Sequence, residues 1–380
     1  MPVDLIQLGT KVKRYREQRL LSPEELSSLT GIAPELLIQI ESGQRAPTGD
    51  QILIFADVFQ CDYRFFISNE QLAPFEQTET LYRRYGSRFT KEDRLKVQEF
   101  LFLCESEETL YLILEMPRSQ PPEIRLTGSS YKFHGKQAAE QLRTFLKYAW
   151  NVIPLDIYRD FRSLGWHVFR RELSDSNISG LCIRHPKAGN CILINYSEDV
   201  YRQRFSVAHE AAHALIDREE DVVVSFWRDR DLREIRTNSF ASHFLVPPRF
   251  LKSIPEPTRW SKPKTIEWAN KFKVSSEVLS IALKEAGLIS PTQQSEMKRI
   301  RVPREMKTDP ELPAGLAPRS RERKEAMLKR GLSSSYVNLC FEAFHRDCLT
   351  AARTSEMLLT TEDEMRSIAE MYGVALTHVS

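Results

Sequence analysis

Residues 205–216 read Phe-Ser-Val-Ala-His-Glu-Ala-Ala-His-Ala-Leu-Ile, an apolar run that holds two histidines and a glutamate. Apolar residues recur through it at helical spacing, which predicts a helix with one buried face. His209 and His213 are four residues apart, so on a helix both side chains project from the same face, about one turn apart. Two imidazoles at that separation can bind one Zn²⁺, with Zn–N distances of about 2.0–2.1 Å.

Glu210 directly follows the first histidine and would lie beside the open coordination position of such a metal. There its carboxylate can take a proton from a water held by the metal and later give it to a leaving amine. The metal can lower the pKa of that water from about 15.7 to about 7. The alternative is a helix whose two histidines are merely packed or exposed. The strand-like run at 191–196, just before the helix, favours the catalytic interpretation.

A catalytic zinc takes three protein ligands and keeps one position open, so a third ligand is needed. Residues 234–247 form a second helical pattern, in which Glu234 and Asn238 share one face. A carboxylate on a helix is better fixed than one in a loop, which favours Glu234 over the acidic run 219–221. We expect that run to be a solvated turn, Asn238 to support the ligands from a second shell, and His243 to face away.

The two motifs together resemble the ImmA/IrrE family of metallopeptidases. The matching stretches are Arg204-Phe-Ser-Val-Ala-His-Glu-x-x-His and Glu-x-x-Thr-Asn-x-Phe-Ala-x-x-Phe-Leu-Val-Pro, within roughly residues 130–250. Thr237 stands where the family usually has Ala, and Val246 where it often has Met; neither change touches a ligand. The resemblance implies a site-specific peptidase whose substrates are commonly repressor-type DNA-binding proteins. It also implies a catalytic base, Glu210, and three zinc ligands: His209, His213 and Glu234.

The composition excludes several classes of protein. At 380 residues the chain can hold two or three domains, and its 54 basic and 52 acidic residues give no overall polyelectrolyte character. Charge breaks every long apolar run, and we find no signal peptide, so we expect a cytoplasmic protein with no membrane partner. The six cysteines contain no Cys-x-x-Cys pair and are expected to be mostly buried free thiols. Cys182 and Cys191 flank an expected hairpin turn at 187–190 and could be cross-strand neighbours.

Residues 5–68 are expected to form five short helices. Ser22-Pro-Glu-Glu25 is a capping box with Pro at the first helical position, and Thr30-Gly31 makes a tight turn before the next helix, residues 33–41. A helix, a glycine turn and a second helix in a compact helical unit are typical of a helix-turn-helix domain. The stretch Ile40-Glu-Ser-Gly-x-Arg-x-Pro47 resembles the Cro and C repressor family (XRE type) over about sixty residues.

The charge of this domain is unusual for a DNA reader. Residues 1–70 carry 7 basic and 10 acidic side chains, a net charge of −3, whereas DNA binding requires a positive face. On the expected recognition helix, Gln39 and Glu35 can read bases, and on the first helix Arg14 and Arg16 can contact phosphates. The alternative is that the domain keeps its fold but serves dimerisation or partner docking.

The rest of the chain predicts an α+β fold that is mainly α. Strand patterns near 165–170, 180–184 and 191–196 indicate a small sheet backed by helices, as in zincins, with His167 on the sheet surface. Residues 298–330 carry 11 basic and 5 acidic side chains and predict a partly disordered or surface linker, with or without an acidic or nucleic-acid partner. The expected segments are a helix-turn-helix domain 1–70, a helical connector and linker 71–128, a zinc metallopeptidase domain 129–255, a helical pair 256–297, a basic linker 298–332 and a C-terminal helical region 333–380.

These observations predict a zinc-dependent, site-specific endopeptidase fused to a helix-turn-helix domain. The resemblance implies that its protein substrate would be a repressor or antitoxin with a helix-turn-helix fold, and that cleavage would control a stress, mobile-element or defence operon. DNA is a further candidate partner, and a homodimer is one arrangement that would strengthen binding to it. Two alternatives stay open: a transcription regulator with a structural or sensory zinc site, and the toxin-like half of a two-gene module.

Overall fold

The computed structural model describes residues 3–61, 63–68, 75–174, 177–226 and 231–376. The chain divides into two compact units, residues 1–106 and 107–380, and the boundary falls inside helix α7 (Lys91–Ile113). Within the described ranges, no helix is both long and apolar enough to cross a bilayer. Helices dominate both units and a small sheet lies in the second, which confirms the α+β, mainly α class.

The first unit is helical, and its local sequence signals form as expected. Ser22 Oγ accepts a hydrogen bond from the Glu25 backbone N–H at 3.1 Å, and a Glu25 carboxylate oxygen accepts one from the Ser22 N–H at 2.8 Å, so the capping box is present. Gly31 ends that helix with a φ of +69°, a left-handed conformation that glycine adopts without strain. The elements are α1 (Leu5–Gln18), α2 (Pro23–Thr30), α3 (Pro34–Glu41), α4 (Gly49–Phe59), α5 (Arg64–Ile67), α6 (Phe75–Tyr85), the 3₁₀ helix η1 (Gly86–Arg88) and the first part of α7.

The second unit holds four strands and the remaining helices. Its strands are β1 (His167–Arg171), β2 (Ile178–His185), β3 (Gly189–Asn195) and β4 (Val222–Phe226). Its helices are the end of α7, α8 (Tyr131–Phe145), α9 (Ile157–Arg162), α10 (Val200–Ile216), α11 (Leu232–Leu245), α12 (Pro248–Lys252), α13 (Lys262–Phe272), α14 (Ser276–Glu285), α15 (Pro291–Lys298), the 3₁₀ helix η2 (Arg304–Met306), α16 (Pro318–Lys329), α17 (Ser334–His345), α18 (Ala351–Met357) and α19 (Glu362–Tyr372).

The four strands form one mixed sheet in the order β1-β3-β2-β4. β1 and β3 run parallel, and the other two pairs are antiparallel. Across the β2–β3 hairpin, Cys182 pairs with Ile192 and Cys191 pairs with Ile183. The two cysteines are therefore diagonal neighbours on opposite faces of the sheet, and both are free thiols.

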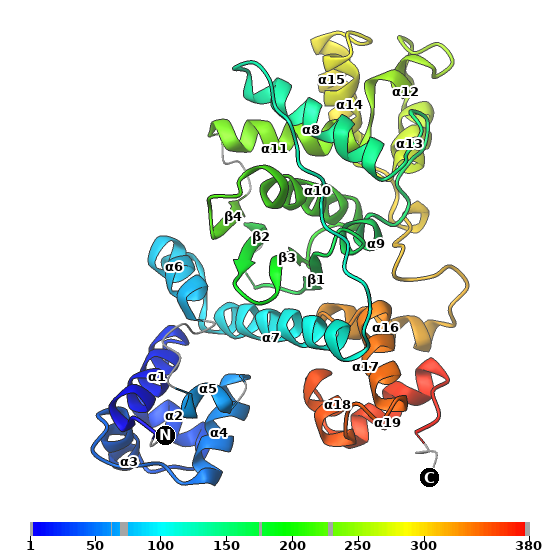
Figure 1. Cartoon of the computed structure of the whole chain (residues 1–380). Helices are drawn as coiled ribbons and strands as arrows, with labels where there is room; N and C mark the ends of the chain where they lie inside the picture. Colours follow the sequence, from blue (N-terminus) through cyan, green and yellow to red (C-terminus); the bar gives the residue numbers. More distant parts are fainter. Residues whose placement is uncertain (1–2, 62, 69–74, 175–176, 227–230, 377–380) are drawn as a thin grey trace. The chain divides into compact units, whose positions relative to one another are not determined.

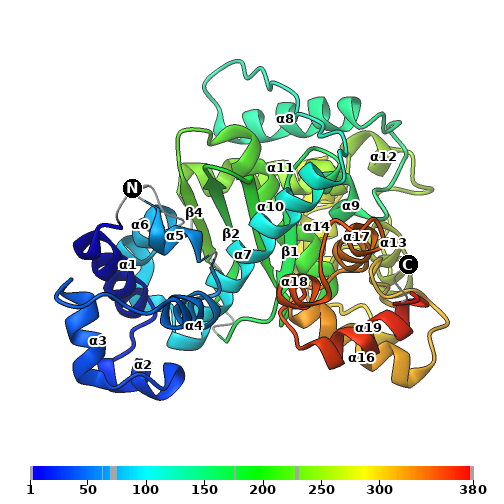
Figure 2. The same cartoon turned by 60° about the horizontal axis from the view of Figure 1, so that its bottom comes forward.

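One face of the sheet is covered by α10. Val168, Ile192 and Ile194 from the strands share a buried core with Val207 and Ala211 from the helix. Helices α11 and α8 lie beyond α10, as both views show (Figure 1, Figure 2). The order of layers is thus sheet, α10, and then the pair α8 and α11, which places α10 in the interior of the unit.

The opposite face of the sheet is covered as well, and this corrects the expectation for His167. Phe169 packs edge-on against Tyr336 of α17, with ring centroids 5.4 Å apart. His167 is fully buried on this face, and its Nδ1 lies 2.7 Å from a carboxylate oxygen of Glu107 at the end of α7. Burial disfavours the imidazolium, but Glu107 and Glu108 outweigh it and raise the pKa of His167 to about 9. His167 is a buried ionic residue and not a sheet-surface one.

Part of the segment expected as a basic linker contacts the interior of the unit. Residues 299–317, here called the strap, cross back over the unit between α15 and α16 and contribute two acidic side chains to the interior. Arg170 Nη1 donates to Asp309 Oδ2 at 2.7 Å, and Arg170 Nη2 lies 2.6 Å from Glu311 Oε2. Arg162 makes a second ion pair with Glu311 at 2.8 Å. Two buried guanidinium groups thus hold the strap in place.

Candidate metal centre

Helix α10 carries the two histidines and the glutamate of the central motif into the interior. Asp199 caps the start of the helix, and its carboxylate accepts a hydrogen bond from the Tyr201 backbone N–H at 3.0 Å. His209, Glu210 and His213 are 6%, 0% and 1% exposed. Polar side chains so deeply buried need partners, and their arrangement defines the site.

Helix α11 brings Glu234 to the two histidines. Asp231 caps this helix and accepts a hydrogen bond from the Glu234 backbone N–H at 2.9 Å, which fixes Glu234 in the first turn. Glu234 Oε2 lies 3.1 Å from His209 Nε2, and Glu234 Oε1 lies 3.3 Å from His213 Nε2. The two Nε2 atoms are 3.2 Å apart. Three buried side chains that can bind a metal therefore converge from two helices.

The separations of these atoms fit a small tetrahedral metal. Bonds of about 2.0–2.1 Å around a tetrahedral zinc place neighbouring ligand atoms roughly 3.3–3.4 Å apart. The observed separations of 3.1–3.3 Å are close to that value. Two imidazoles and one carboxylate are also a donor set that catalytic zinc sites use. Within the described part of the chain, this is the group of acidic, histidine and cysteine side chains whose ligand atoms gather closely enough to hold an ion.

The other nitrogen of each histidine is held by an oxygen. His209 Nδ1 lies 3.1 Å from Asn238 Oδ1, and His213 Nδ1 lies 2.7 Å from Asp217 Oδ2. Because a carboxylate oxygen can only accept, His213 Nδ1 carries a proton, and Nε2 is the nitrogen that faces the centre. Arg236 binds the second oxygen of Asp217. Sequence reasoning anticipates Asn238 but misses Asp217, although its position four residues after His213 on the same helix was a usable signal.

Glu210 lies beside this group without a partner of its own. Within the described residues, neither carboxylate oxygen has a hydrogen-bond partner, and the side chain is fully buried. Burial raises the pKa of the Glu210 carboxyl above its ordinary range. Gly180 on β2 makes room for it: a Cβ at that position would lie 3.0 Å from Glu210 Cγ and 2.9 Å from the Leu193 carbonyl oxygen. A buried, unpartnered carboxylate indicates that a further polar group belongs next to it.

The charges of the group are strongly coupled. Burial opposes ionisation of Glu234, but His209 and His213 outweigh it and hold the pKa of that carboxyl far below its usual range. Burial likewise opposes protonation of His213, but Asp217 and Glu234 raise its pKa to about 9. Without a metal the group therefore retains a proton, which a bound cation would displace.

The residues that we set aside as ligands lie elsewhere. The run 219–221 is a turn at the surface, in which Glu220 pairs with Arg233 at 2.8 Å. His243 is half-buried, and its Nδ1 contacts the Ser239 carbonyl oxygen at 2.7 Å on its own helix. Neither joins the group formed by α10 and the start of α11.

The candidate DNA-binding residues of the first unit divide into two sets. Glu35 and Gln39 lie on the exposed face of α3, where they can reach a partner. Arg16 is buried and makes a two-pronged contact with Glu41, at 2.7 and 2.8 Å, and also donates to the Leu21 carbonyl. Its guanidinium is committed inside the domain, so we withdraw Arg16 as a phosphate contact.

Two further cations of α1 are also used internally. Lys11 Nζ donates to the Phe65 and Ser68 carbonyls at 2.6 and 2.7 Å, and Arg19 donates to the Val58 carbonyl at 2.5 Å. Lys11, Arg16 and Arg19 thus stabilise the fold of the helical domain. This weakens the electrostatic footprint expected of a DNA-binding surface.

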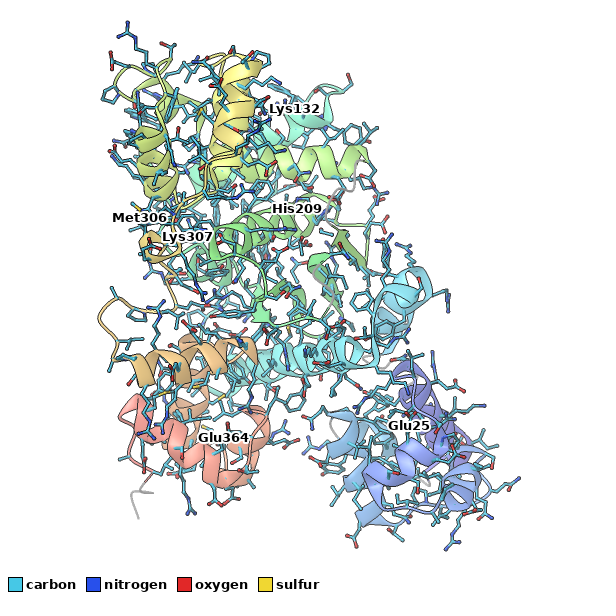
Figure 3. All side chains as sticks on the ribbon, turned by 180° about the vertical axis from the view of Figure 1, so that it is seen from behind. Glu25, Lys132, His209, Met306, Lys307 and Glu364 are labelled. Carbon is cyan, nitrogen blue, oxygen red and sulfur yellow. The ribbon has the colours of Figure 1, made fainter. Side chains whose placement is uncertain are left out.

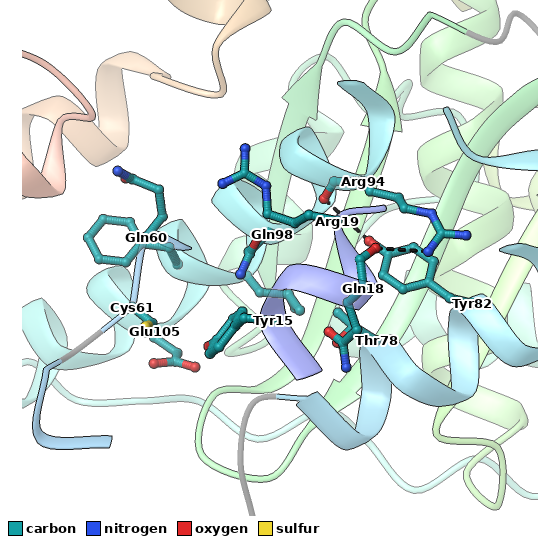
Figure 4. Close-up of a pocket in the computed structure, with 12 residues that line it drawn as sticks. Tyr15, Gln18, Arg19, Gln60, Cys61, Thr78, Tyr82, Arg94, Gln98 and Glu105 are labelled. Atoms are coloured by element: carbon teal, nitrogen blue, oxygen red, sulfur yellow. Dashed lines mark hydrogen bonds between the residues drawn. The ribbon is translucent and has the colours of Figure 1, made fainter. Parts of the chain in front are cut away.

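A small cavity lies in the same unit. Tyr15, Arg19, Tyr82 and Arg94 are among the side chains that converge on it (Figure 4). Its volume is about 30 Å³. Such a space suits a water molecule and is far below the several hundred cubic ångströms of ordinary ligand pockets.

Comparison with known families finds one match in the unit that holds the candidate metal centre and one in the first, helical unit. Residues 161–284 match the IrrE N-terminal-like domain, and residues 12–66 match a helix-turn-helix domain. The first match contains all four residues of the central group, on α10 and α11. No curated protein matches the chain. The chain thus combines a peptidase-like domain of the IrrE type with a repressor-type helix-turn-helix domain, as the resemblance indicated.

Proposed function

We propose that this chain is a zinc-dependent endopeptidase that cleaves a specific protein. The observation that carries the proposal is the convergence of two imidazoles and a carboxylate: His209 Nε2 and His213 Nε2 lie 3.2 Å apart, at 3.1 and 3.3 Å from the nearer oxygen of Glu234, with a buried and unpartnered glutamate beside them. His209, His213 and Glu234 would hold the ion, and Glu210 would serve as the catalytic base. The match of residues 161–284 to the IrrE N-terminal-like domain supports the peptidase class.

Each residue has a distinct task in peptide hydrolysis. A bound Zn²⁺ would supply Lewis acidity, which polarises the scissile carbonyl and makes water nucleophilic near neutral pH. The Glu210 carboxylate accepts a proton from the attacking water and then donates it to the amine nitrogen of the leaving peptide. Asp217 and Asn238 keep the two imidazole rings oriented by their Nδ1 contacts.

The proposal predicts a separation of metal binding from catalysis in the Glu210→Gln variant. We expect that variant to keep about one zinc per chain and to lose cleavage by roughly 10²–10⁴-fold, because an amide cannot accept the proton. Metal content is measured by elemental analysis, and cleavage by mass spectrometry with a small helix-turn-helix protein encoded beside this gene as the first candidate substrate. Undiminished cleavage by Glu210→Gln would remove Glu210 from the mechanism.

For the substrate we propose a repressor or antitoxin with a helix-turn-helix fold, recognised with help from the first unit. The internal use of Lys11, Arg16 and Arg19, together with a net charge of −3 over residues 1–70, favours a protein partner for that unit. Cleavage of such a partner would derepress the operon that it controls. A pull-down with the Glu210→Gln variant should retain the partner, and deletion of residues 1–70 should release it.

A second candidate function is DNA binding by the first unit. The exposed positions of Glu35 and Gln39 on α3 favour it, since these side chains can accept from cytosine or pair with adenine. A gel-shift titration at low salt tests it. Binding that Gln39→Ala weakens at one base pair would support a role as a transcription regulator, and the absence of any shift would leave protein docking.

A further inference from the structure

A large cleft opens directly beside the candidate metal centre. Its volume is about 740 Å³, within the range of sites that enclose small ligands or peptide side chains. Asn238 lines it and also contacts His209 Nδ1 at 3.1 Å, so the cleft begins at a side chain that touches a candidate ligand. Figure 3 labels His209 together with two lysines that line the cleft, Lys132 of α8 and Lys307 of the strap.

The walls of the cleft are largely apolar. The apolar side chains of these walls come from α10, α11, α14 and the strap. One of these side chains, Ile235, directly follows the candidate ligand Glu234 and is 41% exposed. An exposed isoleucine next to a catalytic group loses contact with water when an apolar side chain covers it. The apolar lining residues are Phe205, Ile235, Val278, Ile281, Ile300 and Val302.

Most of the charges around the cleft are already neutralised by partners. Lys132 pairs with Glu285 at 2.6 Å, and Lys307 pairs with Asp199 at 2.5 Å. Arg301, on the exposed rim, is the exception among the described lining cations.

The other two charged lining residues are paired as well. Glu277 forms an ion pair with Lys298 at 2.5 Å, and Arg202 forms one with Glu198 at 2.9 Å. A charged side chain that entered the apolar part of the cleft would lose water without meeting a free counter-ion, since the unpaired Arg301 lies out on the exposed rim. The cleft therefore discriminates against charge.

We infer that this cleft binds an uncharged, apolar segment of the protein substrate, next to the bond that is cut. The inference rests on the proposed peptidase function for the position of that bond. Apolar segments of a folded protein are usually buried. The substrate must therefore expose such a segment, either from a mobile region or by local unfolding, before it is cleaved.

The test is a binding experiment on the full chain that does not depend on cleavage. The Glu210→Gln protein, and its Ile281→Lys derivative, are each applied to an array of short random-sequence peptides. We expect the parent to select peptides with consecutive apolar residues. The lysine adds a cation to the apolar wall, and its helix neighbours Glu277 and Glu285 already have lysine partners. It should therefore weaken the binding of apolar peptides by at least about tenfold and enrich peptides that contain Asp or Glu.

Two further variants make the result decisive. Leu155→Lys is the matched control, because Leu155 is 67% exposed and does not line the cleft, and it should select the same peptides as the parent. Ile235→Lys repeats the test at a partly exposed position, should Ile281→Lys fail to fold. Equal binding of charged and apolar peptides by the parent, or unchanged selection in both cleft variants, would overturn the inference. Absence of zinc or of cleavage would instead count against the proposed peptidase alone.

Discussion

Replacing Asp217 with alanine should weaken zinc binding although Asp217 is not itself a candidate ligand. The carboxylate holds His213 Nδ1 at 2.7 Å, and its second oxygen is bound by Arg236. Removal of the carboxylate frees the imidazole to rotate and leaves the Nδ1 proton without an acceptor. It also leaves the Arg236 guanidinium without this counter-ion.

The size of the effect follows from the contact that is lost. A hydrogen bond to a charged group contributes about 1.5–3 kcal/mol, and each 1.4 kcal/mol corresponds to a factor of ten. We therefore expect the zinc Kd to rise by about 10–100-fold, the range that loss of such outer contacts typically produces. The zinc Kd of Asp217→Asn should lie between those of the unchanged protein and Asp217→Ala, because the amide oxygen can still accept a hydrogen bond from His213 Nδ1 but carries no charge.

The assay is a competition titration of zinc against a chromophoric chelator, with circular dichroism as the check on folding. Asp160→Ala is the matched control: Asp160 is a half-buried carboxylate of the same unit that contacts Tyr148, away from the centre. An unchanged Kd in folded Asp217→Ala, or an equal loss in Asp160→Ala, would refute the argument that the His213–Asp217 contact orients a metal ligand.

Three further predictions follow from particular side chains. Glu234→Ala should lower the zinc content and abolish cleavage, whereas alanine substitutions in the run 219–221 should do neither; the reverse pattern in elemental analysis would move the third ligand into that turn. Gly180→Ala should lose about 1–3 kcal/mol of stability in urea unfolding and lower kcat with zinc retained, because its methyl group crowds Glu210, the proposed catalytic base. His167, with its pKa raised from about 6.5 to about 9, should contribute up to about 3 kcal/mol below pH 6.5, and this contribution should fade as the pH rises through 9. Urea midpoints at pH 6.5 and 9.5 should show a drop that is smaller in His167→Gln, where only the contribution of His213 remains, and an equal drop in both proteins would contradict the prediction.

Local signals allowed much of the fold to be predicted. The capping box at Ser22 and the left-handed Gly31 depend on neighbours within a few residues, so the sequence alone placed the ends of α2. The helical period around His209 and His213 predicted the buried face of α10 for the same reason. His209 and His213 could be predicted to lie side by side, because a helix fixes the separation of residues four apart.

Contacts between distant residues could not be predicted in this way. Arg16 was read as a surface cation because nothing near it in sequence shows that Glu41, 25 residues later, lies against it. His167 was placed on a sheet surface because alternation along a strand does not reveal whether a second layer covers the sheet. Strand β4 was missed because it follows an acidic turn and is only five residues long.

The ion pairs of the strap set a lower limit on how short a working form of the second unit can be. The family match ends at residue 284, but Asp309 and Glu311, which neutralise Arg170 and Arg162, lie beyond it. A gene shortened to the matched region would encode two guanidinium groups buried without counter-charges, at a cost of about 3–5 kcal/mol for each pair that is broken. That loss is comparable to the whole stability of many domains. Any rearrangement of this gene that transplants the peptidase-like unit must therefore carry the coding sequence at least as far as Glu311.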